Sequence, residues 1–319
     1  MPIDRSAPIL RTEALTKKYG EHTALNELTL TVHRGEVFGY IGPNGAGKTT
    51  TFRILCGLLD PTSGKAFVAD KDVTGNKDLI KQLVGFLPDN FGVYPTLRVW
   101  EYLDFFAAAY RVPKKLRHDR IDQCLTIANA MEFKDKFMGA LSRGMKQRVG
   151  IAKTLVHDPQ LLILDEPAAT IDPRARILMR QLLRELAELG KAVLVSSHIL
   201  PELADVCDTV GILQQGKLVA SGAVQQILRD VRQNRLMEVR VLGSIDKAKE
   251  ILGTAPGTWT PVDGVVDGMT AANTLRYEVQ ADEAQLAKAV LLLLQNKIAI
   301  THFAEVPADL EDVFMSLTK

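Results

Sequence analysis

The 319-residue sequence has few cysteines, no long apolar run and no concentrated block of basic residues. Cys56, Cys124 and Cys207 are far apart and lack the spacing of a metal site, so we expect buried thiols in a reducing compartment. The longest apolar stretches, such as AVLLLL at 289–294, are far shorter than the roughly 20 residues that cross a bilayer. The opening residues MPIDRSAPIL contain no apolar segment typical of a secretory signal. These absences predict a cytosolic protein whose own chain does not span a membrane.

Charge is nearly balanced over the whole chain, with a formal net charge of +1, but it is unevenly distributed. Residues 236–319 carry 7 Lys+Arg against 12 Asp+Glu, and residues 1–235 carry 32 against 26. The basic surplus is modest and spread out, so we expect no nucleic-acid partner. The change in composition predicts two domains, residues 1–235 and 236–319.

The N-terminal domain alternates short apolar runs with helical patterns, which is typical of a largely parallel sheet covered by helices. Helices are predicted at 49–59 and 174–189 from their apolar spacing. Residues 97–157 are mostly helical in pattern and should form a separate lobe. Three short apolar stretches are predicted as buried strands: EVFGYI (36–41), LLIL (161–164) and AVLVSS (192–197).

The C-terminal domain has a different pattern. Its segments RLMEVRVL, DKAKEIL, WTPVDGVV, TLRYEVQ, EAQLAKAVLLLLQ and IAITHF follow the order β-α-β-β-α-β, and PADLEDVFMSLT adds a last helix. This order predicts a ferredoxin-like α+β domain. It contains no catalytic constellation, so we expect an accessory or regulatory role.

A glycine-rich segment satisfies a complete nucleotide-binding motif. GPNGAGKT follows a predicted strand and opens a predicted helix, and it fits G-x-x-x-x-G-K-[ST]. Gly45 and Gly47 allow backbone N–H groups to turn towards phosphates, Lys48 reaches the β- and γ-phosphates, and the Thr49 hydroxyl suits Mg²⁺. A chance glycine turn is the alternative, and the full spacing disfavours it. The expected ATP contacts in this motif are Gly42, Pro43, Asn44, Gly45, Ala46, Gly47, Lys48, Thr49 and Thr50.

Two acids and a histidine follow other predicted strands. Asp165 and Glu166 come directly after LLIL, at the strand end where open α/β sheets bind ligands. Asp165 suits the surroundings of a Mg²⁺ ion, and Glu166 suits a base that polarises the attacking water. His198 follows AVLVSS in the same predicted sheet and is placed to contact the γ-phosphate or the water. The alternatives are a solvated acidic loop and a structural histidine.

The stretch ALSRGMKQRVGIA at 140–152 predicts a second anion-binding helix. Ser142 is a good N-cap. Gly144 costs the helix about 1 kcal/mol relative to Ala, which makes sense if a ligand must approach the backbone closely. Arg143 and neighbouring basic residues add positive charge at the helix N-terminus, a position suited to an anion.

GPNGAGKTT, LSRGMKQ, LLILDEP, the loop AATID and SSH occur here in the order and spacing of an ABC transporter's ATP-binding subunit. The first 230 residues resemble that family. The resemblance implies a P-loop NTPase sheet core with an antiparallel β subdomain and a helical lobe, and it implies ATP and Mg²⁺ as cofactors. Tyr19 matches the aromatic residue that stacks on adenine in the family. The tail ending LEDVFMSLT resembles the C-terminal extension of many bacterial ABC-2 type ATPases, which favours export.

The resemblance also accounts for the second anion-binding helix. ATP-binding subunits of this family pair head to tail, as homodimers or heterodimers, and bury two ATPs at their interface. Each ATP lies on one subunit's P-loop and is capped by the partner's signature helix. The implied contacts to the partner's ATP are Ser142, Arg143, Gly144, Met145 and Asp172. A separate membrane permease is implied as the partner, which would place the subunit on the inner face of the cell membrane.

Three positions depart from the family pattern. The signature reads LSRGM in place of LSGGQ, and the loop AATID has Thr170 and Ile171 where small residues and Leu are usual. Asp89 stands where the family's Gln contacts Mg²⁺. A carboxylate suits Mg²⁺ but has a shorter reach; the alternative is that Asp89 only begins a turn with Asn90.

Aromatic residues are concentrated just after this position. The 25 residues from Phe86 to Tyr110 contain 8 of the chain's 19 aromatics. They predict either a docking patch for the permease's coupling helix or part of the lobe's core. Two other functions stay open at this point: a soluble ABC-type ATPase acting on nucleic acid or the ribosome, and an ATP-binding regulatory module with weak turnover.

Overall fold

The computed structural model describes residues 7–168, 173–198, 203, 205–227, 235–262 and 274–305. Asp172 and the last helix expected from PADLEDVFMSLT lie outside the described residues. The chain divides into two compact units, Met1–Val224 and Gln225–Lys319. The division falls somewhat before the boundary after residue 235 that the charge pattern suggests, and that boundary stays a prediction.

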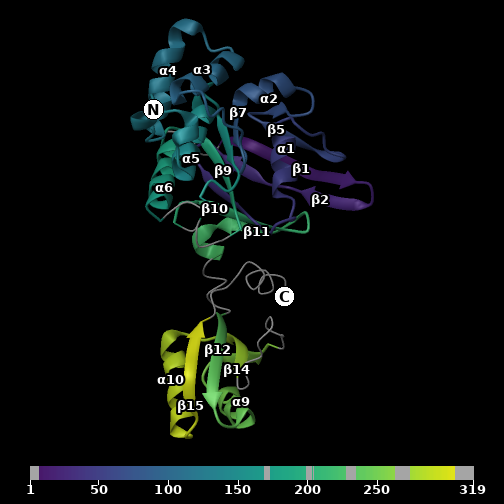
Figure 1. Ribbon diagram of the computed structural model, residues 1–319. Coiled ribbons are helices and arrows are strands. Elements are labelled where there is room, and N and C mark those ends of the chain that lie inside the picture. The colour runs from purple at the N-terminus through teal and green to yellow at the C-terminus, as the bar shows by residue number, and fades with distance from the viewer. Residues whose placement is uncertain are drawn as a thin grey trace. The chain divides into compact units, whose positions relative to one another are not determined.

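The first unit contains two sheets (Figure 1). The smaller is antiparallel, with the order β2-β1-β5-β6 and with β3 also paired to β1. Its strands are β1 (Pro8–Tyr19), β2 (His22–Leu28), β3 (Thr31–His33), β5 (Ser63–Val68) and β6 (Lys71–Asp72). This sheet is the antiparallel β subdomain expected from the family resemblance.

The larger sheet has the order β11-β10-β4-β9-β8-β7, and all its strands are parallel except β11. Every residue of β4, β8 and β9 is buried, because helices or the other sheet cover both faces. The strands are β4 (Val37–Ile41), β7 (Val84–Leu87), β8 (Leu161–Leu164), β9 (Ala192–Ser197), β10 (Thr209–Gln214) and β11 (Lys217–Ala223). The three buried strands predicted from the sequence are confirmed.

Within the described residues of this unit, the helices are α1 (Lys48–Leu55), α2 (Lys77–Leu83), α3 (Val99–Ala109), α4 (Lys114–Ile127), α5 (Arg143–Leu155) and α6 (Pro173–Glu188), with short 3-10 turns at Met131–Phe133 and Met138–Ala140. Helices α3, α4 and α5 contact one another and form the expected helical lobe (Figure 1). The predicted helix at 49–59 was too long. It ends at Leu55 because Gly57 adopts a left-handed backbone conformation with φ +67°.

A continuous apolar core joins the two sheets through α1. Phe38 and Tyr40 of β4 are almost completely buried, and Tyr40 packs on Phe52 of α1 with ring centroids 5.7 Å apart. Leu10 and Leu25 of the antiparallel sheet belong to the same cluster. The loop between β4 and α1 is therefore anchored at both ends by buried side chains.

Among its described residues, the second unit contains a four-stranded antiparallel sheet and the two helices α9 and α10. Its order β13-β14-β12-β15 is the ferredoxin-like order that the sequence pattern predicted. The elements are β12 (Arg235–Leu242), α9 (Ile245–Gly253), β13 (Thr258–Pro261), β14 (Thr274–Gln280), α10 (Glu283–Gln295) and β15 (Ala299–Glu305). The unit has its own apolar core, in which Val239 and Tyr277 pack against Leu252 and Leu293. Throughout the described parts of both units, no helix is long and apolar enough to cross a bilayer.

Candidate nucleotide-binding site

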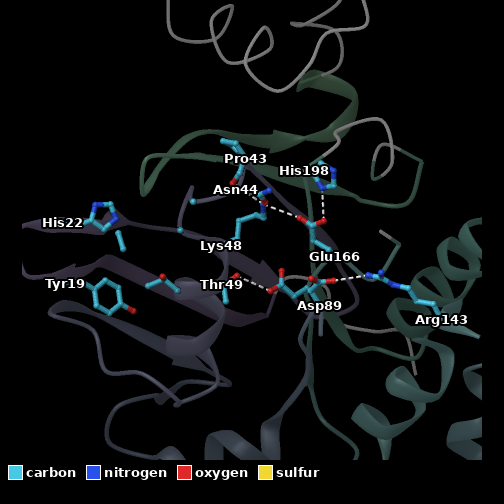
Figure 2. Close-up of a pocket in the computed structure, with 15 residues that line it drawn as sticks. Tyr19, His22, Pro43, Asn44, Lys48, Thr49, Asp89, Arg143, Glu166 and His198 are labelled. Atoms are coloured by element: carbon cyan, nitrogen blue, oxygen red, sulfur yellow. Dashed lines mark hydrogen bonds and ion pairs between the residues drawn. The ribbon is translucent and has the colours of Figure 1, made fainter. Parts of the chain in front are cut away.

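A cavity of about 570 Å³ opens at the carboxyl ends of the parallel strands (Figure 2). The register pairs Ile41 with Ser197 and Leu87 with Leu164, so the segments that follow four strands meet at one edge of the sheet. The residues that line the cavity are Tyr19, His22, Ala24, Pro43, Asn44, Gly45, Gly47, Lys48, Thr49, Thr50, Asp89, Arg143, Asp165, Glu166 and His198. Most of the residues singled out from three separate motifs thus share one site.

The loop between β4 and α1 turns its backbone towards the cavity. Gly47 immediately precedes α1 with φ +111°, and a Cβ at this position would lie 2.6 Å from the carbonyl oxygen of Ala24. Only glycine fits there. The N-terminus of α1 consequently opens at the cavity, where its free N–H groups favour an anion. Gly42 and Ala46 belong to the same loop but do not line the cavity.

Lys48 brings a largely desolvated positive charge to the cavity. The residue is 7% exposed, and its Nζ contacts the Gly42 carbonyl oxygen and lies 3.6 Å from Glu166 Oε1. Burial lowers the pKa of Lys48, while the nearby carboxylates of Glu166 and Asp165 oppose that shift. A cation held in a low-dielectric wall attracts phosphate far more strongly than one in water.

Asp165 is fixed by two hydroxyl groups. Ser196 Oγ donates to one carboxylate oxygen at 2.7 Å, and Thr49 Oγ1 donates to the other at 3.3 Å. Burial raises the pKa of Asp165, and the two hydroxyl contacts act in the opposite direction. The same Ser196 Oγ accepts the backbone N–H of Glu166 at 2.9 Å, so β9 orients both acids at the end of β8.

The pair Thr49 and Asp165 suits Mg²⁺. Its ligand atoms are a hydroxyl and a carboxylate oxygen, the hard donors that Mg²⁺ prefers, and both face the cavity beside the phosphate loop. Mg²⁺ is usually held by only one or two protein groups together with substrate phosphates. These two residues therefore fit such an ion.

Glu166 and His198 form a contact pair beside the phosphate loop (Figure 2). His198 Nδ1 lies 2.8 Å from Glu166 Oε2, and the other carboxylate oxygen faces Lys48. Glu166 has a left-handed backbone, with φ +48°, which is uncommon for a residue with a side chain. Strained backbone of this kind concentrates at functional sites.

Asp89 lies in the same cavity, two residues beyond the end of β7, and meets the signature helix of its own chain. Arg143 Nη2 is 3.7 Å from Asp89 Oδ1, and Asn90 Nδ2 donates to Asp89 Oδ2 at 3.2 Å. Both side chains of the ion pair are about half exposed, so the pair contributes at most about 1 kcal/mol. Asp89 thus lies in the cavity and also contacts Asn90, and its contact with Mg²⁺ stays a prediction.

The other signature residues point elsewhere. Ser142 caps α5 by accepting the N–H of Met145 at 3.4 Å. Ser142, Gly144 and Met145 do not line this cavity, whereas Arg143 does. The helix N-terminus predicted to bind an anion is present, and of its residues 142–145 only Arg143 lines the chain's own cavity.

The end of the cavity opposite Glu166 is formed by a β-hairpin. Tyr19 and His22 face each other across the turn between β1 and β2, and both line the cavity (Figure 2). Lys17 Nζ lies 5.2 Å from the Tyr19 ring centroid and donates to the Asp60 carbonyl oxygen at 2.9 Å, so it braces the ring. The sequence reasoning missed His22 and Ala24. Their position across the hairpin turn from Tyr19 was the only available signal.

Comparison with known proteins gives a consistent result. The family model described as ABC transporter matches residues 25–169. An uncharacterized ABC transporter ATP-binding protein of Nostoc is 40% identical over 64% of this chain and 61% of its own length. The Nod factor export ATP-binding protein I of Ralstonia nicotianae is 35% identical over 70% of both chains. An uncharacterized ABC transporter ATP-binding protein of Bacillus subtilis, YxlF, is 31% identical over 97% of this chain and 99% of its own.

Solved structures agree with these relatives. CbiO1 of Clostridium perfringens, part of the ABC transporter complex CbiONQ, matches with a TM-score of 0.65 and 30% identity over 71% of this chain and 94% of its own. A dimeric post-hydrolysis state of the ATP-binding cassette MJ0796 with ADP and Pi matches with a TM-score of 0.61 and 26% identity over 67% and 98%.

The chain belongs to the ATP-binding proteins of ABC transporters. Members of this family are ATPases. In this ABC protein, residues of the family's P-loop line the cavity. The aligned part covers 61% of the Nostoc relative, so roles that depend on the whole of such proteins are taken up as proposals below.

Replacing Lys48 with Ala in this ABC protein is expected to abolish nucleotide binding. The phosphates would lose the main positive charge of the P-loop, and no other Lys or Arg of the described chain lines the cavity apart from the half-exposed Arg143. Titration with ATP, followed by calorimetry, measures the effect. Lys17→Ala provides a comparison, because it removes a lysine beside Tyr19, at the end of the cavity expected to hold adenine, and leaves the phosphate loop untouched. An unchanged ATP affinity in Lys48→Ala would contradict the assignment of the phosphate site.

Proposed function

We propose that the protein is the ATP-hydrolysing subunit of an ABC exporter and powers a separate membrane permease. The observation that carries this proposal is the convergence of Lys48, Asp165 and Glu166 in one cavity, contributed by the P-loop and the end of β8. Binding without turnover would need only the phosphate loop. The additional acid next to a histidine supports hydrolysis.

Each residue has a distinct role in this proposal. The N–H groups at the start of α1 and the Lys48 ammonium hold the β- and γ-phosphates. Thr49 and Asp165 would hold Mg²⁺, which neutralises developing charge on the phosphates when bound. Glu166 polarises the attacking water as general base, and His198 orients its carboxylate through the 2.8 Å contact. Tyr19 supplies an aromatic face for adenine.

We further propose that two ATP-binding subunits pair head to tail and share two ATPs. The support is the signature helix, whose residues Ser142, Gly144 and Met145 form a capped helix N-terminus outside the chain's own cavity. Such a terminus favours an anion by about 0.3–2 kcal/mol, so a γ-phosphate presented by a second subunit suits it. The relative solved as a dimer with ADP and Pi supports pairing of two such subunits. Pairing would then depend on ATP.

The proposed site of action is the inner face of the cell membrane. The relative named for Nod factor export supports export as the direction. Exposed aromatic side chains of the helical lobe, including Tyr94, Trp100 and Phe105, would receive the permease's coupling helix.

Purification from native membranes in mild detergent tests this proposal. We expect the full chain to co-purify with one polytopic membrane protein in a fixed ratio, and ATP hydrolysis by the complex to respond to the presence of that protein. Recovery of the chain with ribosomes or nucleic acid, and without any membrane protein, would contradict the transporter role.

Removal of residues 236–319 is expected to leave a folded unit that still binds ATP, because the two units have separate apolar cores. We expect weaker self-association and an altered ATPase rate, consistent with an accessory role for the ferredoxin-like unit. Sedimentation and ATP titration of the truncated protein measure both effects. A soluble, folded truncation that has lost all ATP binding would show that the second unit contributes to the nucleotide site.

A further inference from the structure

Helix α5 carries a partly buried lysine, Lys153, that contacts two aromatic rings. Lys153 lies in the last turn of α5, is partly buried, and has no ion-pair partner among the described residues. Its Nζ is 5.2 Å from the ring centroid of Phe106 on α3 and 5.7 Å from that of Phe91 in the loop after β7. Burial lowers the pKa of Lys153 to about 8. A cation thus lies between two aromatic rings without a carboxylate to compensate it.

The position of Phe91 is fixed by a glycine on the same helix. A Cβ at Gly150 would lie 2.7 Å from Phe91 Cζ and 2.9 Å from Leu87 Cδ1. The ring therefore packs directly on the α5 backbone, one helical turn before Lys153. This close packing holds the loop after β7 against the helical lobe.

Lys153 borders a set of aromatic side chains, here called the aromatic surface: Phe91, Tyr94, Phe105 and Phe106. Phe106 contacts Phe105 edge to face at 5.2 Å, and Phe105 contacts Tyr94 in the same way at 5.7 Å. Tyr94 and Phe105 are 50% and 51% exposed. Exposed aromatic clusters of this kind usually mark partner sites, and aromatic residues dominate binding energy in such sites.

We propose that the aromatic surface binds a segment of the permease in which apolar side chains flank one Asp or Glu, and that this carboxylate pairs with Lys153. The proposal rests on the transporter function proposed above and adds the chemistry by which the partner is recognised. An aromatic surface alone accepts many apolar segments. A desolvated, unpaired ammonium at its edge selects a segment that brings the opposite charge, because a neutral or basic segment would leave that charge buried and uncompensated.

The same contact connects the partner to the nucleotide site. Phe91, beside Lys153, is separated by one residue from Asp89, which lines the ATP cavity. The loop after β7 thus carries both a ring that contacts Lys153 and a carboxylate that lines the ATP cavity. The position of the segment after β7 would thus respond both to the permease bound at the aromatic surface and to the nucleotide in the cavity.

Charge exchange between the two proteins tests the proposal. In the complex purified from membranes, Lys153→Glu should reduce recovery of the permease at least tenfold, Lys153→Arg should preserve it, and Lys153→Met should give an intermediate loss. Lys136→Glu is the matched control. Its Nζ also lies 5.2 Å from a ring centroid, that of Phe133, which is not part of the aromatic surface, and recovery should stay at the wild-type level.

A second step identifies the partner residue. Each Asp and Glu in the permease's cytoplasmic loops is changed to Lys in turn and combined with Lys153→Glu. We expect one of these changes to restore recovery to within about threefold of wild type. A thermal shift on adding ATP checks that each Lys153 variant is folded.

The outcomes separate this proposal from the one it rests on. If wild-type protein recovers no membrane protein, the transporter function itself is wrong. If wild type recovers the permease and both Lys153→Glu and Lys153→Met do so equally well, only the role of Lys153 is wrong. Loss in Lys153→Glu that no acidic-to-Lys change restores would also overturn the charge pairing.

Discussion

Glu166→Gln is expected to keep ATP binding but to reduce turnover at least a hundredfold, equivalent to about 2.7 kcal/mol of barrier. The amide preserves the shape of the side chain and its left-handed backbone position, but it cannot take a proton from the attacking water. Lys48, Thr49 and Asp165 remain in place to hold the phosphates. The variant should therefore accumulate as an ATP-bound dimer.

Steady-state phosphate release and ATP affinity, measured together, check this result. Glu36→Gln is a matched control, because Glu36 also contacts a histidine, His33 Nδ1 at 3.1 Å, but it lies just before β4 and does not line the cavity. Its turnover should remain near normal. If Glu166→Gln hydrolyses ATP at the wild-type rate, Glu166 is not the base.

The parts of the site that could be predicted are those set by local spacing. Strand, loop and helix must follow one another around GPNGAGKT, so the P-loop is visible in the sequence itself. Asp165 and His198 could be placed in the same site because both follow buried strands, and parallel strands end at one edge of a sheet.

Other features depend on contacts that no spacing encodes. The pairing of Arg143 with Asp89 joins α5 to the loop after β7 and needs the docking of the helical lobe. The left-handed backbone of Glu166 and the bracing of Tyr19 by Lys17 likewise arise from tertiary packing. The absence of an ion-pair partner for Lys153 among the described residues also depends on tertiary packing, because the sequence alone does not distinguish this lysine from most surface lysines.

The fold shows the same division. The largely parallel sheet of the first unit and the ferredoxin-like sheet of the second followed from the alternation of patterns. The end of α1 did not, because apolar residues continue past the point where Gly57 stops the helix. The domain boundary after residue 235 stays a prediction, because charge composition changes there whereas the contacts divide the chain after Val224.

Ser142→Arg is expected to eliminate ATP hydrolysis while leaving ATP binding near normal. Ser142 does not line its own cavity, so Lys48 and Asp165 are undisturbed in the altered subunit. The arginine would instead place bulk at the helix N-terminus where the second subunit's γ-phosphate must lie. ATP-driven pairing and the hydrolysis that depends on it should both be lost, which sedimentation with and without ATP measures.

Mixing Ser142→Arg subunits with Lys48→Ala subunits tests the shared site most directly. Neither variant should hydrolyse ATP alone. In a head-to-tail pair both defects fall in one composite site and the other site is whole, so we predict that the mixture regains ATPase activity, up to about half of the wild-type rate when heterodimers are isolated. If each subunit used its own signature helix, each site would carry one defect. A mixture that stays inactive, although the heterodimer is present, would contradict the account.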